Sequence, residues 1–254
     1  MATDESFFRM YEEYINRHNY KEMFAAMLSN IQSTGVKLGT VRSCLAIGPG
    51  GGEYEIEFLK HCAPNISKFL AIEPDHESVD QLRASLRTNL PGVESQVFET
   101  QLQSWEGLSD PVDLIFVFQS LYYFTVDEQK ELFATMHDNW LTSGGYVAIM
   151  SASRPKAPGR EEIWELLEAS TPPWEDIEAD MQKAGFTKVY AYEMQGKMDF
   201  TNPDESLLRF IQLHGTRSVT LDYIRNVMKE LYPGGKLSDW FDAMAIFKRK
   251  QEIL

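Results

Sequence analysis

The pattern that indicates a chemical function most clearly in this sequence consists of three glycines and one acid. The glycines are Gly48, Gly50 and Gly52, at alternate positions after the apolar run 41–47. Glu73 ends a second apolar run, 25 residues after the first glycine. Glycines allow a tight turn and a close approach of backbone to ligand, and an acid at the end of the next strand accepts hydrogen bonds from ribose hydroxyls. The spacing therefore predicts a site for an adenosine-containing cofactor.

The residue after the third glycine indicates which cofactor this is. Dinucleotide-binding loops have the spacing G-x-G-x-x-G and place a helix N-terminus against a pyrophosphate. Here the spacing is G-x-G-x-G, and Glu53 follows at once, so its carboxylate would repel a pyrophosphate. S-adenosylmethionine has no phosphate and carries a sulfonium and an ammonium cation. The loop therefore favours S-adenosylmethionine and methyl transfer over a nicotinamide cofactor and hydride transfer.

Composition limits the class of protein and its partners. A chain of 254 residues with 43% hydrophobic and 24% charged residues is typical of one globular α/β domain. The net charge of −14 argues against a nucleic-acid partner. It is compatible with a small cationic substrate, although an acidic, solvated surface needs no functional explanation.

The cysteines, the histidines and the hydropathy of the chain argue against disulfides, a metal site, secretion and a membrane span. Cys44 and Cys62 indicate no disulfide framework, and the five histidines show neither metal-ligand spacing nor a Ser-His-Asp order. We therefore expect no bound metal. The N-terminus does not resemble a signal peptide, and no apolar run approaches the roughly 20 residues that span a bilayer. We expect a cytoplasmic monomer with no membrane partner.

The first part of the chain alternates strands and helices. The expected strands are 41–47, 68–72, 96–99, 112–118 and 146–150. The expected helices are 52–62, 75–88 and 126–139. Run 112–118 (VDLIFVF) is almost wholly apolar, as buried parallel strands are. This alternation predicts an α/β protein with a doubly wound parallel sheet.

Helical additions flank this alternating region. Residues 5–33 have helical spacing with a break at 16–19, which predicts two helices. Later expected helices are 161–169, 176–184, 203–214 and 219–231, with strands at 186–193 and 243–247. We predict a single domain over 1–254, with an N-terminal helical cap (1–35), a cofactor-binding core (36–152) and substrate-side insertions (153–242) interleaved with the last strands.

Three segments together resemble a known family. IGPGGGE (47–53), IEP (72–74) and QSLYY (119–123) are similar to segments of the histamine N-methyltransferase family, which are class I S-adenosylmethionine-dependent enzymes. Weaker similarity covers Trp164, Met198-Asp199 and Leu207-Leu208. The resemblance implies a Rossmann-like, seven-stranded, mostly parallel sheet with helical additions at the N-terminus and in the C-terminal half.

The pattern and the resemblance together indicate the residues of a cofactor site. The three glycines form the loop, and Glu73 is the acid that follows it. The resemblance implies that Ser78 stands where the family has a cofactor-binding glutamine. It also implies that a residue after the third strand approaches the adenine. The expected cofactor-binding residues are Gly48, Gly50, Gly52, Glu73, Ser78, Thr100, Gln101 and Phe118.

The residues expected to hold the methyl acceptor are polar or aromatic. The Gln119 amide can orient a neutral heterocycle, although a strand-end amide can also cap a helix. Tyr122 and Tyr123 offer aromatic faces, although one of the pair is expected to pack in the core. We expect Gln119 and Tyr123 to act in catalysis. The full set of expected substrate-binding residues is Tyr11, Tyr14, Tyr20, Glu22, Gln119, Tyr122, Tyr123, Trp164 and Asp242.

The sequence departs from the family at two acceptor-binding positions. The family's glutamate in the N-terminal helical segment aligns with Tyr20, or with Glu22 if a gap is allowed, and its asparagine before the last strand aligns with Phe241 or Asp242. The acceptor is therefore not fixed as histamine. We predict an N-methyltransferase of a small amine or imidazole. The alternatives are a methyltransferase of oxygen or carboxylate acceptors, a non-catalytic protein that binds S-adenosylmethionine, and a nicotinamide-dependent oxidoreductase.

Overall fold

The computed structural model describes residues 7–152, 173–214, 219–234 and 237–250. The chain divides into two compact units. The larger unit contains residues 24–153, 172–194 and 242–254, and the smaller one contains 1–23, 154–171 and 195–241. The organisation as one domain stays a prediction, because it concerns how these two units are joined.

A seven-stranded sheet has the order β3-β2-β1-β4-β5-β7-β6. Its strands are β1 (Ser43–Ile47), β2 (Lys68–Glu73), β3 (Glu94–Glu99), β4 (Val112–Phe118), β5 (Leu141–Ala152), β6 (Phe186–Asp199) and β7 (Leu237–Arg249). Strands β1 to β5 pair in parallel, whereas β7 runs antiparallel to β5. The predicted α/β class with a mostly parallel sheet is confirmed.

The described helices begin and end close to the expected positions. They are α1 (Phe7–Asn16), α2 (Tyr20–Thr34), α3 (Glu53–Cys62), α4 (His76–Asn89), α5 (Val126–Thr135), α7 (Trp174–Lys183), α8 (Glu205–His214) and α9 (Leu221–Leu231), with short turns η1 (Leu102–Ser104), η2 (Leu121–Tyr123) and η3 (Met136–Trp140). The helix expected over 126–139 ends as α5 at Thr135 and continues as the π-helical turn η3. The helix expected over 161–169 lies outside the described residues. None of the helices in the described ranges is both long and apolar enough to cross a membrane.

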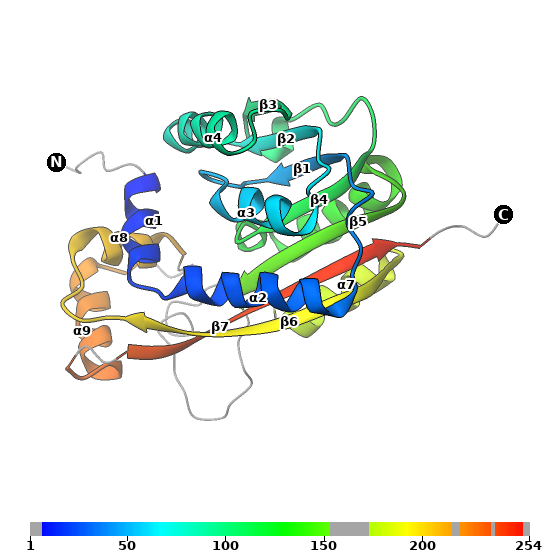
Figure 1. The fold of residues 1–254 in the computed structure, drawn as a ribbon. Coiled ribbons are helices and arrows are strands. Elements are labelled where there is room, and N and C mark those ends of the chain that lie inside the picture. Colours follow the sequence, from blue (N-terminus) through cyan, green and yellow to red (C-terminus); the bar gives the residue numbers. More distant parts are fainter. Residues whose placement is uncertain (1–6, 153–172, 215–218, 235–236, 251–254) are drawn as a thin grey trace. The chain divides into compact units, whose positions relative to one another are not determined.

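Strand β4 is buried because helices cover both faces of the sheet (Figure 1). On one face, the Phe58 ring of α3 packs edge-on against Phe116 at 5.3 Å, and the Phe24 ring of α2 packs against Phe118 at 6.3 Å. The alternate residues of β4 point to the opposite face. There they join a core cluster with α5 and α7, which includes Ile115, Val117, Leu132, Phe133, Ile177 and Met181.

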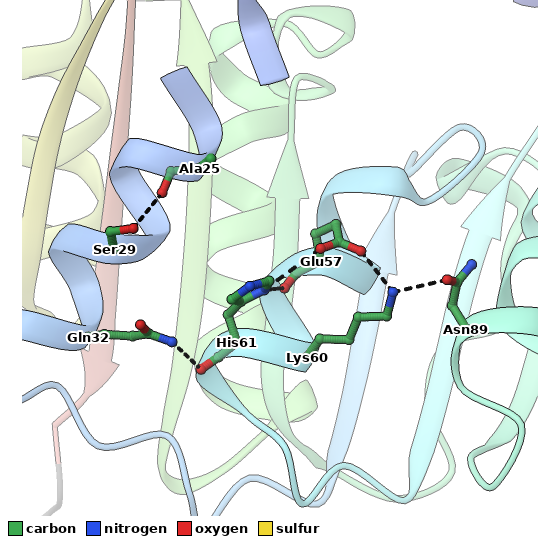
Figure 2. A network of polar contacts seen from close by, with 7 residues as sticks. All are labelled: Ala25, Ser29, Gln32, Glu57, Lys60, His61 and Asn89. Atoms are coloured by element: carbon green, nitrogen blue, oxygen red, sulfur yellow. Dashed lines mark hydrogen bonds and ion pairs between the residues drawn. The ribbon is translucent and has the colours of Figure 1, made fainter. Parts of the chain in front are cut away.

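Polar contacts tie α2, α3 and α4 together on their outer side (Figure 2). Gln32 Nε2 on α2 donates to the His61 carbonyl of α3 at 3.1 Å. Lys60 Nζ donates to Glu57 Oε1 at 2.8 Å and to Asn89 Oδ1 of α4 at 2.9 Å. Exposed contacts of this kind each add well under about 1 kcal/mol, so packing against the sheet remains the main restraint on these helices.

The smaller unit has its own apolar core. Residues of β6, α8 and α9, and one residue directly after β6, form it: Met198, Phe200, Leu207, Leu208, Ile211, Ile224 and Met228. Helix α1 joins this unit through Tyr14, whose ring stacks on Phe210 at 4.4 Å. The joint after α1 is tied to β6, because Lys197 N donates to Asn19 Oδ1 at 2.7 Å. The predicted break between two N-terminal helices is confirmed.

Candidate functional site

The glycine loop joins β1 to α3 as a compact turn. Gly48 N donates to the Ile72 carbonyl at 2.8 Å, and Gly52 N donates to the Pro49 carbonyl at 2.9 Å. Gly50 has a φ of 56° and Gly52 one of 74°, in the left-handed region that favours glycine. Nothing lies within 4 Å of the place where a Gly50 side chain would be. The loop therefore leaves its backbone open to close approach at Gly50.

The two glycines differ in what a side chain would meet, which leads to a prediction. A Cβ at Gly52 would lie 2.3 Å from Leu82 Cδ1, in the buried contact between α3 and α4. We expect Gly52→Ala to lower the free energy of unfolding by about 2 kcal/mol, from left-handed strain and from overpacking. Gly50→Ala carries the strain alone and should cost about 1 kcal/mol. Urea unfolding of both variants measures this, and an equal loss at both positions would contradict the packing argument.

Glu73 lies at the end of β2 and contacts the glycine loop. Its carboxylate accepts hydrogen bonds from Gly50 N, at 2.9 Å, and from Asp75 N, at 3.0 Å. The side chain is only 6% exposed. Burial raises the pKa of Glu73, and the two backbone hydrogen bonds oppose that rise. The acid predicted from spacing therefore helps to hold the loop in place.

A cavity of about 310 Å³ lies at the carboxyl ends of the strands in the larger unit. Residues from the ends of β1, β2 and β4 and from the segment after β3 line it: Ile47, Gly48, Ile72, Pro74, Gln101, Leu102, Gln103, Ser120, Tyr123 and Phe124. Of the predicted site residues, Gly48, Gln101 and Tyr123 are among these. None of these described lining residues carries a charge. The ends of parallel strands are where α/β sheets bind ligands.

The other predicted cofactor residues are not among the described lining residues. Gly50, Gly52 and Glu73 form the loop and its support. Ser78 is buried in the first turn of α4, and its N–H donates to the Asp75 carboxylate at 2.9 Å. Thr100 follows β3 directly. Phe118 is 4% exposed, and its ring packs against the Phe24 and Phe58 rings of α2 and α3.

Gln119 and Asp242 come together although 123 positions separate them in the chain. Gln119 Nε2 donates to Asp242 Oδ2 at 3.0 Å. The backbone of Gln119 has a φ of 51°, which is uncommon for a residue with a side chain, and its N–H donates to the Met150 carbonyl at 2.7 Å. Asp242 has no exposed surface. Gln119, which directly follows β4, is thus hydrogen-bonded to both β5 and β7.

Two tyrosines that follow Gln119 lie next to each other, with ring centroids 4.7 Å apart. Tyr123 is 52% exposed and lines the cavity. Burial raises the pKa of Tyr122, and the nearby Asp242 charge adds to that rise, while a hydrogen bond with Tyr123 opposes it. The predicted pair therefore adjoins both the cavity and the buried carboxylate.

Sequence reasoning missed several residues of this region. Burial raises the pKa of Tyr54, in the first turn of α3, and the charges of Glu53 and Asp242 add to that rise. Ser120 lines the cavity and donates to the Ile47 carbonyl at 2.6 Å. Both are direct neighbours of residues already singled out, Glu53 and Gln119. Adjacency to the motif was the signal that could have found them.

The remaining predicted acceptor residues lie in the smaller unit or outside the described ranges. Tyr11 and Tyr14 share a helix face, as expected from their spacing, since both rings contact Phe210. Tyr20 is buried, and its ring lies edge-on to that of His18 at 6.2 Å, while Glu22 is exposed. Trp164 lies outside the described residues. The functional roles of these four described residues and of Trp164 stay predictions.

The described residues bring no three His, Cys, Asp or Glu side chains together as metal ligands. No protein-family model matches the chain, and no curated protein does. The comparisons find similarity at the level of structure.

Several solved structures superpose on most of this chain. N-methyltransferase NodS from Bradyrhizobium japonicum WM9 does so with a TM-score of 0.57 and 12% identity, over 91% of this chain and 98% of NodS. YcgJ from Bacillus subtilis gives 0.57 and 14%, over 91% of this chain and 99% of YcgJ. The [4+2]-cyclase SpnF gives 0.54 and 13%, over 89% of this chain and 80% of SpnF. A second NodS structure contains S-adenosylhomocysteine.

At these identities the similarity establishes the fold. Its sheet order, with the antiparallel β7 between β5 and β6, is that of the class I S-adenosylmethionine-dependent methyltransferases. The chain therefore has the Rossmann-like α/β fold of that class, as the resemblance implied.

Proposed function

We propose that this protein binds S-adenosylmethionine and transfers its methyl group to a nitrogen of a small amine or imidazole. One observation carries the proposal. The Glu73 carboxylate at the end of β2 is bonded to Gly50 of the glycine loop, beside a 310 Å³ cavity at the strand ends. The fold and the resemblance to histamine N-methyltransferases support the same cofactor.

The loop and the acid fit this cofactor chemically. Each Glu73 oxygen accepts one backbone N–H and retains a second lone pair, which can accept a ribose hydroxyl. Gly50 lets the ligand approach the backbone closely. Glu53, at the start of α3, disfavours a pyrophosphate but not a cation. The proposed cofactor-binding set is unchanged from the sequence: Gly48, Gly50, Gly52, Glu73, Ser78, Thr100, Gln101 and Phe118.

Catalysis then depends on alignment. The bound cofactor supplies a methyl group that its sulfonium has already activated. The protein has to hold an unprotonated acceptor nitrogen in line with the methyl–sulfur bond, and such positioning can lower the barrier by roughly 7–11 kcal/mol at best. We assign this orienting role to Gln119, with Tyr122 and Tyr123 as aromatic walls. An imidazole suits the site because one of its nitrogens is unprotonated at neutral pH.

The charges of the larger unit favour nitrogen acceptors over carboxylates. Among the described residues, neither lysine nor arginine lines the cavity. Two acids belong to the surrounding structure: Asp242, which accepts a hydrogen bond from Gln119, and Glu73, which lies between the lining residues Ile72 and Pro74 in the chain. A carboxylate or phenolate acceptor would be repelled by these groups, whereas a neutral or cationic nitrogen compound would be attracted.

Calorimetry with S-adenosylhomocysteine tests the cofactor. We expect saturable binding in the micromolar range, and no heat at high micromolar ligand would contradict the proposal. Reduced nicotinamide dinucleotide is the control ligand, and its fluorescence should not change. Transfer of a labelled methyl group is then screened over matched amines, imidazoles, phenols and carboxylic acids. Label on phenols or acids alone would identify an oxygen methyltransferase instead.

SpnF gives one specific reason to keep a second candidate. A [4+2]-cyclase shares this fold at a similar TM-score, so the fold alone does not imply methyl transfer. A protein that binds S-adenosylmethionine without transferring its methyl group is the alternative. It predicts affinity for S-adenosylhomocysteine without label on any acceptor.

A further inference from the structure

We propose that Glu55 is a specificity-determining residue, which distinguishes S-adenosylmethionine from S-adenosylhomocysteine by the sulfonium charge that only the former carries. Glu55 would release its proton to water when the cationic donor binds and keep it when the product binds. The preference for donor over product would then rise with pH. The inference rests on the proposed function and deepens it, since it concerns how the same cofactor site is regulated by its own product.

The first argument is the place of Glu55 relative to the strand ends. Strand β1 lies between β2 and β4 in the sheet. Glu73, the proposed acceptor for the ribose hydroxyls, ends β2, and Gln119, the proposed orienting residue, follows β4. The cofactor's sulfur joins the ribose to the transferred methyl group, so a cofactor that reaches from one strand end to the other carries its charge across the end of β1. The glycine loop follows β1 there, and Glu55 lies in the first turn of α3, three residues after that loop.

The second argument is the burial of the Glu55 carboxyl. Glu55 is only 2% exposed, and its Oε2 has no hydrogen-bond partner among the described residues. A buried carboxyl that lacks partners is costly to ionise, so it keeps its proton unless a cation comes near. Such a cation lowers the cost of ionisation, which makes Glu55 sensitive to the charge of the ligand.

The titratable groups around Glu55 do not supply that positive charge. Burial raises the pKa of Glu55 to about 8, and the charge of Glu73 on β2 adds to that rise. The pKa values of Cys44 on β1 and Tyr54 on α3 are raised first by burial, and the charge of Glu55 adds to both rises. A glutamate, a cysteine and a tyrosine are neutral or negative in every protonation state. A bound sulfonium would therefore bring a positive charge to a group of acids.

The contacts of α3 with its other neighbours are apolar on this side. Leu82 of α4 lies beside Gly52, directly before α3, and the Phe116 ring of β4 packs against Phe58. Apolar surroundings screen a charge weakly, so a ligand charge acts on Glu55 over a longer range than in water.

The direction of the effect follows from linkage. A unit positive charge at about 10 Å, at an effective dielectric constant of about 20, lowers the pKa of a carboxyl by roughly one. Over the pH range in which the free protein holds the Glu55 proton and the donor complex does not, donor binding releases that proton. Donor affinity must then rise relative to product affinity as the pH increases through this range. The product therefore competes less well with the donor at mildly alkaline pH.

Carboxyl NMR tests this coupling directly. The protein is labelled with ¹³C at its glutamate carboxyls, and the Glu55 signal is assigned by its loss in Glu55→Gln. Its titration is followed from pH 5.5 to 9 in the complexes with S-adenosylmethionine and with S-adenosylhomocysteine. We expect the midpoint to lie roughly one pH unit lower in the S-adenosylmethionine complex. Equal midpoints in the two complexes overturn the proposal.

Affinities give a second readout, measured by calorimetry at pH 6.5 and at pH 9. We expect the preference for S-adenosylmethionine over S-adenosylhomocysteine to rise roughly five- to tenfold more in the unchanged protein than in Glu55→Gln. Both ligands carry an amino group that also titrates, and the comparison with the variant removes that contribution. Glu57→Gln, on the solvent side of the same helix, should keep the full rise. The same rise in Glu55→Gln as in the unchanged protein, or its loss in Glu57→Gln, overturns the role of Glu55.

Binding of S-adenosylhomocysteine at pH 6.5 is measured first in each protein. No binding to the unchanged protein overturns the proposed cofactor and this inference together. Binding of both ligands with no difference in their pH dependence overturns only the role of Glu55. Neither measurement requires a methyl acceptor or turnover.

Discussion

At pH 9, Glu55→Gln is expected to melt roughly 5–10 °C above the unchanged protein, while at pH 4.5 the two should melt together. Glu55 is 2% exposed on α3, and its Oε2 has no hydrogen-bond partner among the described residues. Burial, with a smaller effect of Glu73, raises its pKa from 4.5 to about 8. Glutamine has the shape of the protonated acid but never ionises.

The sign follows from proton binding. Between pH 4.5 and 8 the folded protein holds the Glu55 proton and the unfolded chain does not, so stability falls as the pH rises through that range. Glu55→Gln stays neutral, so its stability does not fall with rising pH for this reason. Thermal melting from pH 4.5 to 9 measures the difference, with Glu57→Gln on the solvent side of α3 as the matched control, expected within about 2 °C of the unchanged protein. A constant offset at all pH values would show that Glu55 does not titrate in this range.

Glu73→Ala is expected to weaken S-adenosylhomocysteine binding by roughly 10–150-fold, which corresponds to about 1.5–3 kcal/mol. The variant removes the acceptor proposed for the ribose hydroxyls. It also releases the Gly50 N–H that this carboxylate holds, so the loop is less ordered before binding. Calorimetry on both proteins measures the change.

The control for Glu73 removes a carboxylate from the other end of the same sheet. Glu94 lies exposed at the start of β3, paired with Lys68 at the start of β2. Glu94→Ala should change the affinity by less than about twofold, because exposed charges at that distance are screened. If Glu73→Ala binds as well as the unchanged protein while both remain folded, Glu73 does not contact the ligand.

The elements of the core were predictable because each depends on local spacing. The run 112–118 is apolar without alternation, and β4 is indeed covered by helices on both faces. The break at 16–19 separates α1 from α2 as expected. Element ends were less certain, since β5 begins at Leu141, before the strand start expected at residue 146. The register of its pairing with β4 shifts between Val112 and Leu114, so residues 142–145 of β5 are accommodated at that point.

The candidate site was predictable only in part. The glycines and Glu73 follow from a pattern within 26 residues, and the structure joins them by a hydrogen bond. Phe118 packs towards α2 and α3, and its expected contact with the cofactor stays a prediction. Tyr54 and Ser120 were missed, since nothing in their own spacing distinguishes them from other helix and strand-end residues.

By itself, the sequence determined the strand–glycine–helix–strand–acid order and hence the character of the candidate site, because close neighbours in the chain build it. Only the tertiary structure decided the partner of Gln119. Asp242 reaches it because β7 inserts antiparallel beside β5, and Ala152 then pairs with Asp242 at the strand ends. That placement depends on burying β7 between two strands that are distant from it in the chain. Local spacing does not encode such a contact, because its free energy comes from packing across the whole sheet.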